Sequence, residues 1–117
     1  MKQIISTPKA PSAIGPYNQA TAFDKLIFTS GQIALNPATM EIVNGGVQEQ
    51  TKQVMENLKA VLEEAGSSFE NVLKTTCYLS DMDNFAAFNE IYSQYFKGET
   101  APARSTVAVK TLPKNVL

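Results

Sequence analysis

The sequence predicts an α+β fold in which two amphipathic helices lie on one face of a mixed or antiparallel sheet. Up to about residue 46, short β-prone runs alternate with turn signals, and at Val47 the apolar pattern changes to helical spacing. Later runs complete the order β-β, α, β, α, β, which is typical of helices covering a sheet. No linker, repeat or low-complexity tract divides the 117 residues, so we expect a single domain over residues 1–117.

The first half of the chain is predicted as two strands, a loop and a long helix. The strands are expected over 17–23 and 25–30, joined by a tight connection at Asp24-Lys25. A helix of about 19 residues follows from Val47, because apolar residues recur there every three or four positions. Gly66 is the expected helix stop.

The second half is predicted as strand, helix, strand. The first of these strands covers 73–79. Asp81 or Asp83 can cap the helix, whose aromatic stripe over 85–96 indicates core packing and not a base-stacking platform. The last strand alternates over 103–109.

The side of the sheet away from the helices carries an unusual pattern. In these strands the second alternating side, which is expected to face away from the helices, is small, uncharged or apolar apart from Lys74 and Arg104. A side that faces solvent normally carries several charges. We therefore expect another subunit to cover the second side, which predicts an obligate oligomer.

Composition excludes several classes of function. A net charge of -1 and a pI near 5.4 give no general attraction to nucleic acid or to an anionic membrane. The absence of histidine excludes Ser-His, Cys-His and His-metal mechanisms. Cys77 is the one cysteine, which fits a reducing, cytoplasmic location, and no signal peptide or membrane span is visible.

Arg104 is the strongest single candidate for a functional residue. It lies in a strand of otherwise small and apolar residues, where a guanidinium without a partner is costly. One interpretation is a structural salt bridge to a carboxylate of this or a neighbouring chain. The other is an anchor for the carboxylate of a small ligand, which the planar guanidinium fork suits.

Three further positions have both a structural and a functional interpretation. Tyr17 follows the rigid Gly15-Pro16 turn and either packs or lines a pocket. Gly31 ends a β-run with Ser30 and either marks a bulge or lets a ligand approach bare backbone. Asn89 shares the apolar stripe of its helix and is either surface filler or a polar group that needs a partner.

Five segments also resemble a known family, the RidA-like reactive intermediate deaminases, or YjgF family. The resemblance covers the whole length of the chain, and the Pro-Ala-Arg-Ser, Ser-Gly-Gln and Gly-Pro-Tyr elements are specific in combination. The segments are Ile14-Gly15-Pro16-Tyr17, Thr29-Ser30-Gly31-Gln32-Ile33, 57–66, Phe88-Asn89-Glu90-Ile91-Tyr92 and Pro102-Ala103-Arg104-Ser105-Thr106-Val107.

The resemblance implies a chorismate-mutase-like subunit of a homotrimer, with sites in the clefts between subunits. It implies hydrolysis of 2-imino acids such as 2-iminobutanoate and 2-iminopropanoate, or their enamine tautomers, to 2-oxo acids and ammonia. Pyridoxal-phosphate-dependent threonine or serine dehydratases release such imines. A protonated imine carbon is already electrophilic, so this chemistry needs no metal or cofactor of the protein's own.

The resemblance also implies the roles of individual residues. Arg104 would hold the substrate carboxylate, Tyr17 would line the pocket, and Ser30 would lie near the attacking water. Gly31 and Asn89 would shape and polarise the binding site. Thr106, which stands where many members have cysteine, would contribute its backbone N–H.

The sequence departs from the family pattern at its end. Family members usually continue after Leu112-Pro113-Lys114 into a last strand with a glutamate-rich ending, and one of those glutamates is credited with handling the catalytic water. This sequence stops at Leu117, before that strand. The general base is therefore left unassigned.

Two other functions compete with hydrolysis. One is a non-catalytic trimeric binder that senses small 2-oxo acids or acts through a regulatory partner protein. The absent glutamate and Thr106 in place of cysteine favour it. The other is a ribonuclease or translation inhibitor, a role sometimes attached to the family, which the acidic pI and the lack of histidine disfavour.

Overall fold

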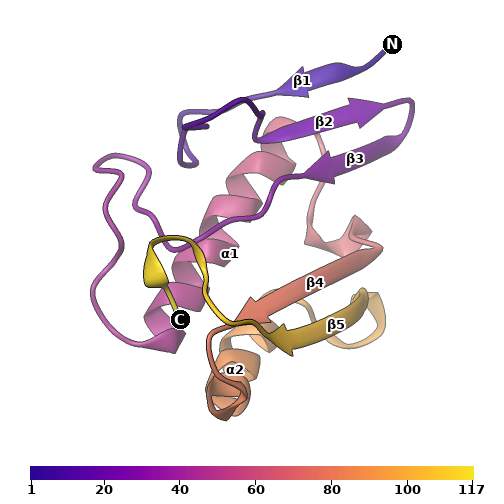
Figure 1. Ribbon diagram of the computed structural model, residues 1–117. Helices are drawn as coiled ribbons and strands as arrows, with labels where there is room; N and C mark the ends of the chain where they lie inside the picture. The colour runs from indigo at the N-terminus through magenta and orange to yellow at the C-terminus, as the bar shows by residue number, and fades with distance from the viewer.

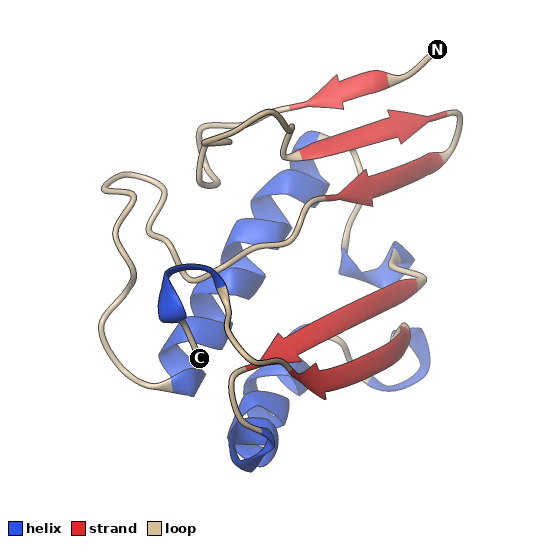
Figure 2. Ribbon diagram, viewed as in Figure 1, coloured by secondary structure: helices blue, strands red, loops and turns tan.

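The computed structural model describes residues 1–117 and places two small sheets on one side of a long helix (Figure 1). Figure 2 shows the second helix behind the lower sheet. The two helices are α1 (Val47–Glu64) and α2 (Phe85–Tyr95). The antiparallel sheet has the order β1 (Gln3–Ile5), β2 (Ala20–Phe23), β3 (Leu26–Thr29), and the parallel pair is β4 (Lys74–Leu79) and β5 (Ala103–Ala108). The predicted α+β class, with mixed strand pairing and two helices, is confirmed.

Local signals set both ends of α1 close to the predicted bounds. At its start, the Glu49 carboxylate accepts a 2.7 Å hydrogen bond from the Gly46 N–H. At its end, Gly66 adopts a φ of 81°, and the Ser67 N–H donates to the Leu62 carbonyl at 2.8 Å. A positive φ strains any residue with a Cβ, so glycine is the natural stop here.

The first sheet is larger than predicted, and its strands are shorter. The hairpin of β2 and β3 turns at Asp24, whose φ is 55°, as the turn signal indicated. The predicted strand over 17–23 begins only at Ala20, because the residues before it form a turn. The strand β1 was not predicted, since three residues are too few to show a period of two.

Asp81 caps the short turn that leads into α2 and not α2 itself, whose N-cap residue is Asn84 and has no side-chain cap hydrogen bond. Its carboxylate accepts a 2.8 Å hydrogen bond from the Asp83 N–H and closes a short 3-10 turn over Met82–Asn84. The helix α2 continues directly from this turn and runs to Tyr95. A structural role thus accounts for Asp81.

The buried interior consists of two apolar clusters joined by α1. One lies between α1, α2 and β4, and the other lies between α1 and the first sheet. The larger contains Met55, Leu79, Phe88, Tyr92 and Phe96, and the smaller contains Ala10, Ala20 and Val61. The aromatic stripe of α2 is therefore core, as predicted. No helix is both long and apolar enough to cross a bilayer.

Two buried amides hold the loops of the first sheet in place. Gln19 is 3% exposed, and its side chain makes four hydrogen bonds of 2.7–3.2 Å with the backbone of Thr7, Ala10 and Pro11. Asn57 on α1 is 1% exposed and donates to the Leu35 carbonyl at 3.0 Å. These contacts fix the segments 7–11 and 31–35 where backbone groups lack ladder partners.

We expect Gln19→Leu to lower the free energy of unfolding by about 3 kcal/mol, because several buried backbone groups lose their only partner. The measurement is urea unfolding followed by circular dichroism. Gln94→Leu is the matched control, since Gln94 is exposed on α2, and it should change stability by less than about 0.5 kcal/mol. Equal losses in the two variants would contradict the structural role of Gln19.

The register of the parallel pair corrects one sequence prediction. Arg104 pairs with Thr75, so it lies on the helix-covered face of β5, whereas Lys74 pairs with Ala103 on the opposite face. Alternation alone had placed the two charges together on the open side. A period of two divides a strand into two faces but does not say which face the helices cover.

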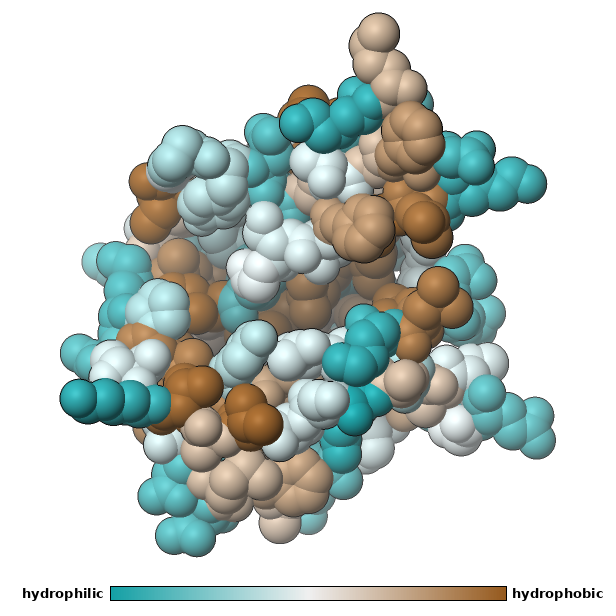
Figure 3. All heavy atoms as spheres, turned by 45° about the vertical axis from the view of Figure 1, so that its right-hand side comes forward, coloured by the Kyte–Doolittle hydropathy of each residue, from teal (hydrophilic) through white to brown (hydrophobic).

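The opposite faces of both sheets, here called the outer sheet faces, are apolar and exposed. Lys74 is the single charged residue on these strand faces. The chain exposes 7514 Å², whereas a compact monomer of 12.7 kDa exposes roughly 6,200 Å². Figure 3 shows apolar side chains gathered around a hollow between the upper and lower parts of the molecule. The large exposed apolar residues on these strands are Ile4, Phe23, Leu26, Phe28, Tyr78 and Val107.

Candidate functional site

The Arg104 guanidinium is held by neutral groups. Its Nη1 donates a 2.6 Å hydrogen bond to Oδ1 of Asn89. Its Cζ lies 4.7 Å from the ring centroid of Tyr92 and 5.3 Å from that of Phe85. The side chain is half-buried, and none of these contacts is with a carboxylate. The predicted alternative of a structural salt bridge within the chain is therefore wrong, and no carboxylate of this chain neutralises the positive charge.

The neighbours of Arg104 on the same face are uncharged. Thr106 pairs with Cys77, and the Thr106 hydroxyl is buried without a hydrogen-bond partner. Burial raises the pKa of the Cys77 thiol, while the Thr75 hydroxyl and the Arg104 charge act in the opposite direction. Cys77 is thus a half-buried neutral thiol.

Tyr17 and Gly31 meet in a different place, a hollow of about 230 Å³ beside the first sheet. The Tyr17 N–H donates to the Gly15 carbonyl at 2.8 Å, and this tight turn presents a ring that is 49% exposed. Buried Gln19 and Leu35 form part of the floor. The rigid turn that the sequence predicted therefore places Tyr17 at the edge of a concave surface.

The fold of one chain gives no reason for glycine at position 31. Its φ is not positive, and a Cβ built there would meet no atom within 4 Å. A tight turn or a close backbone approach within the chain is therefore not the explanation. The adjacent Ser30 is committed to structure, since its hydroxyl donates to the Asn18 carbonyl at 2.6 Å.

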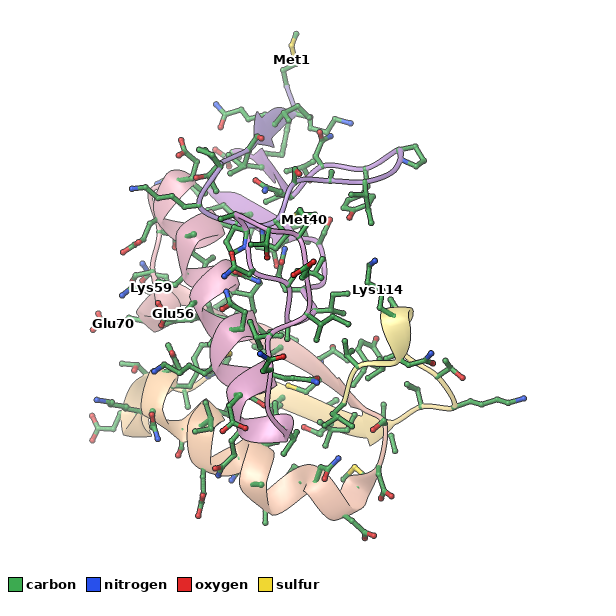
Figure 4. All side chains as sticks on the ribbon, turned by 90° about the vertical axis from the view of Figure 1, so that its left-hand side faces the viewer. Met1, Met40, Glu56, Lys59, Glu70 and Lys114 are labelled. Atoms are coloured by element: carbon green, nitrogen blue, oxygen red, sulfur yellow. The ribbon has the colours of Figure 1, made fainter.

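Lys114 also lines the hollow with Tyr17, and the sequence analysis missed it as a candidate. Figure 4 shows Lys114 projecting from the short turn over Pro113–Asn115. Its φ is 56°, so the turn holds it in a left-handed conformation. Lys114 lies near Tyr17 because this turn packs against the loops of the first sheet. No local sequence motif predicts that packing.

A second, wider hollow lies on the opposite side of α1, where Figure 4 labels Glu56, Lys59 and Glu70. The Tyr95 hydroxyl donates to Oε2 of Glu56 at 2.6 Å, and burial together with this hydrogen bond raises the pKa of Tyr95 to about 12. The Tyr95 hydroxyl and the Glu56 carboxylate are thereby paired with each other. No three acidic or cysteine side chains gather anywhere into a set that could hold a metal ion.

The predicted site residues thus fall into two groups within one chain. Arg104, Asn89 and Thr106 belong to β5 and α2, whereas Tyr17, Ser30 and Gly31 belong to the first sheet and its loops. Arg104 does not line the hollow that contains Tyr17. A single copy does not bring the six residues together.

A family model described as endoribonuclease L-PSP matches residues 7–117. The chain belongs to this family, the RidA-like or YjgF family. The resemblance seen in the sequence is therefore confirmed over nearly the whole chain.

Known members of the RidA-like family carry several names. A RutC family protein of Pyrococcus abyssi is 55% identical over 116 residues, which are 99% of this chain and 91% of the relative. The 2-iminobutanoate/2-iminopropanoate deaminase of Homo sapiens is 48% identical over 114 residues, covering 97% of this chain and 82% of the relative. The crystal structure of Escherichia coli TdcF with bound serine has a TM-score of 0.91 at 44% identity, over 97% of this chain and 91% of that one. Imine deaminases are thus among the relatives.

Proposed function

We propose that this RidA-like protein hydrolyses 2-imino acids, or their enamine tautomers, to 2-oxo acids and ammonia. Water adds to the electrophilic imine carbon, and the resulting carbinolamine expels ammonia as the carbonyl forms. The observation that carries the proposal is the state of Arg104, whose guanidinium is fixed in place and contacts no carboxylate. A human relative named for this reaction supports the same substrate class.

The surroundings of Arg104 suit the capture of an organic acid. A carboxylate partner inside the protein would compete with the ligand, whereas an amide oxygen and two aromatic faces stabilise the cation and leave its charge available. Asn89 accepts a hydrogen bond from one guanidinium nitrogen, so its direct role is to hold the arginine in place. The E. coli relative with bound serine supports a small carboxylate as ligand.

The second group of residues is proposed to come from a neighbouring copy in a homotrimer. The hollow with Tyr17 and Gly31 would face Arg104 across the subunit boundary, and the open space at Gly31 would admit the ligand or the neighbour. The apolar outer sheet faces, with the excess exposed area, support such an assembly. Each copy would then contribute half of each site.

Within this site the protein has a limited chemical task. It anchors the carboxylate, excludes other orientations and places one water, and orientation alone can supply several kcal/mol of the barrier reduction. Ser30 is proposed to lie near the water, and the Thr106 backbone N–H is proposed as a donor to the ligand. The general base stays unassigned. A cytoplasmic location stays a prediction from the cysteine-poor sequence.

The test is a coupled assay in which a threonine dehydratase generates 2-iminobutanoate and the appearance of 2-oxobutanoate is timed. We expect the protein to accelerate the hydrolysis step well beyond its rate in buffer. Unchanged rates, together with measurable binding of 2-oxobutanoate, would replace the proposal by the non-catalytic binder. Cleavage of RNA that co-purifies with the oligomer, with no effect on the imine, would favour the ribonuclease.

A further inference from the structure

The contacts of Arg104 come from one face of one helix. Phe85, Asn89 and Tyr92 are spaced four and three residues apart on α2, which places them in a row along its surface. The guanidinium therefore meets an aromatic ring, an amide and a second ring in sequence. We call Phe85, Asn89 and Tyr92 the guanidinium clamp.

Tyr92 is the member of the clamp with the firmest support. Its ring is 7% exposed, and its hydroxyl shares a 2.7 Å hydrogen bond with Thr75 Oγ1. Thr75 is the residue of β4 that pairs with Arg104 of β5. The ring is thus tied to the same strand pair that carries the arginine, so the relative position of ring and guanidinium is set from both ends.

A single hydrogen bond cannot fix the plane of a guanidinium. An arginine side chain has about 2 kcal/mol of rotamer entropy, and it can still turn about the bond that one acceptor makes. A ring face at 4.7 Å from Cζ restricts that rotation of the guanidinium. A carboxylate ligand needs two of the guanidinium N–H groups in a fixed plane for two-point binding.

We propose that Tyr92, held by Thr75, is a positioning residue that sets the plane of the Arg104 guanidinium for two-point binding of a ligand carboxylate. This inference rests on the proposed function and adds a residue that does not touch the substrate itself. The competing interpretation is that Tyr92 only fills the core, where it packs against Phe96 with ring centroids 4.8 Å apart.

The chain offers a direct spectroscopic probe, because Arg104 is its only arginine. Protein labelled with ¹⁵N-arginine should give one Nε–Hε signal from the assembled protein. We expect Tyr92→Leu to shift this signal and to broaden it, since the ring that shields and restrains the guanidinium is gone. We expect Tyr92→Phe to leave it near the wild-type position, because the ring is kept.

The functional readout is the difference in affinity between 2-oxobutanoate and its uncharged amide. We expect Tyr92→Leu to weaken 2-oxobutanoate about tenfold and the amide less than about twofold, while Tyr92→Phe, which keeps the ring, weakens 2-oxobutanoate only about threefold. Phe96→Leu is the matched control, since Phe96 is 6% exposed in the same cluster but has no contact with the guanidinium. It should leave the affinity ratio and the arginine signal unchanged.

Several results would overturn the inference. Equal weakening of both ligands by Tyr92→Leu, or the same change in Phe96→Leu, would show a packing role only. If Tyr92→Leu does not fold, Thr75→Val and Tyr92→Phe replace it: each should weaken 2-oxobutanoate about threefold, and the double variant no further, because both remove one hydrogen bond. Additive or absent effects would count against positioning.

The wild-type measurement separates this inference from the proposed function. Wild-type protein that binds no 2-oxobutanoate would overturn both. Wild-type protein that binds it, with Tyr92→Leu binding equally well, would overturn the positioning role of Tyr92 and leave the proposed function standing.

Discussion

Replacing Arg104 by methionine is expected to lower the rate of 2-iminobutanoate hydrolysis at limiting substrate by at least about a hundredfold, or roughly 2.7 kcal/mol. Removing one partner of a desolvated charged pair typically costs about 2–5 kcal/mol, and here the lost partner is the proposed carboxylate anchor. Methionine keeps the fold in this variant, since its flexible thioether can lie between the rings of Phe85 and Tyr92. The coupled dehydratase assay gives the rate, and circular dichroism reports the fold.

Two companion variants sharpen the result. Arg104→Lys should recover only part of the loss, because an ammonium keeps the charge but not the planar fork. Lys74→Met removes the same charge from the neighbouring strand on the opposite face, and it should hydrolyse the imine at the wild-type rate. An Arg104→Met variant as fast as the wild type, or a Lys74→Met variant as slow as Arg104→Met, would contradict the anchor.

Mixing two inactive variants is expected to restore about a quarter of the wild-type activity. The first variant is Arg104→Met. The second is Gly31→Phe, which fills the open space beside Tyr17 without a steric clash at Cβ. If each site takes Arg104 from one copy and the hollow from the next, random 1:1 assembly of a closed ring leaves about one site in four with both halves intact.

The experiment requires unfolding the two variants together and refolding them, so that the copies exchange. Each variant refolded alone should stay below about 1% of the wild-type rate, and each is its own control. A mixture that is no more active than its two parents, although mass spectrometry shows mixed oligomers, would show that the two groups do not form a site across the subunit boundary.

The helices and the individual roles of several residues could be predicted because their causes are local. The period of α1, its stop at Gly66 and the cap at Asp81 depend on residues within one or two turns of each other. The choice of Arg104 depended on a charge in an apolar strand, and this too is visible along the chain. Such local patterns predict the folded structure well because tertiary packing keeps the local conformations that they favour.

The remainder could not be predicted because it depends on contacts between distant segments. The faces of β4 and β5 are decided by their parallel register, and the sequence therefore placed Arg104 beside Lys74 on the wrong side. Gln19 looks like an ordinary polar residue until segment 7–11 folds over it. The rings that hold Arg104 were recognised as core, but their contact with a cation arises only when α2 packs on β5.

The outer sheet faces have a consequence for how this protein must be made. A newly folded single copy exposes aromatic and branched aliphatic side chains to solvent. Surfaces of this kind also associate non-specifically when copies collide. Assembly into the oligomer and aggregation therefore compete, and the rates of both rise with protein concentration. Refolding yield should pass through a maximum at intermediate dilution, with lone copies dominating below it and precipitate above it.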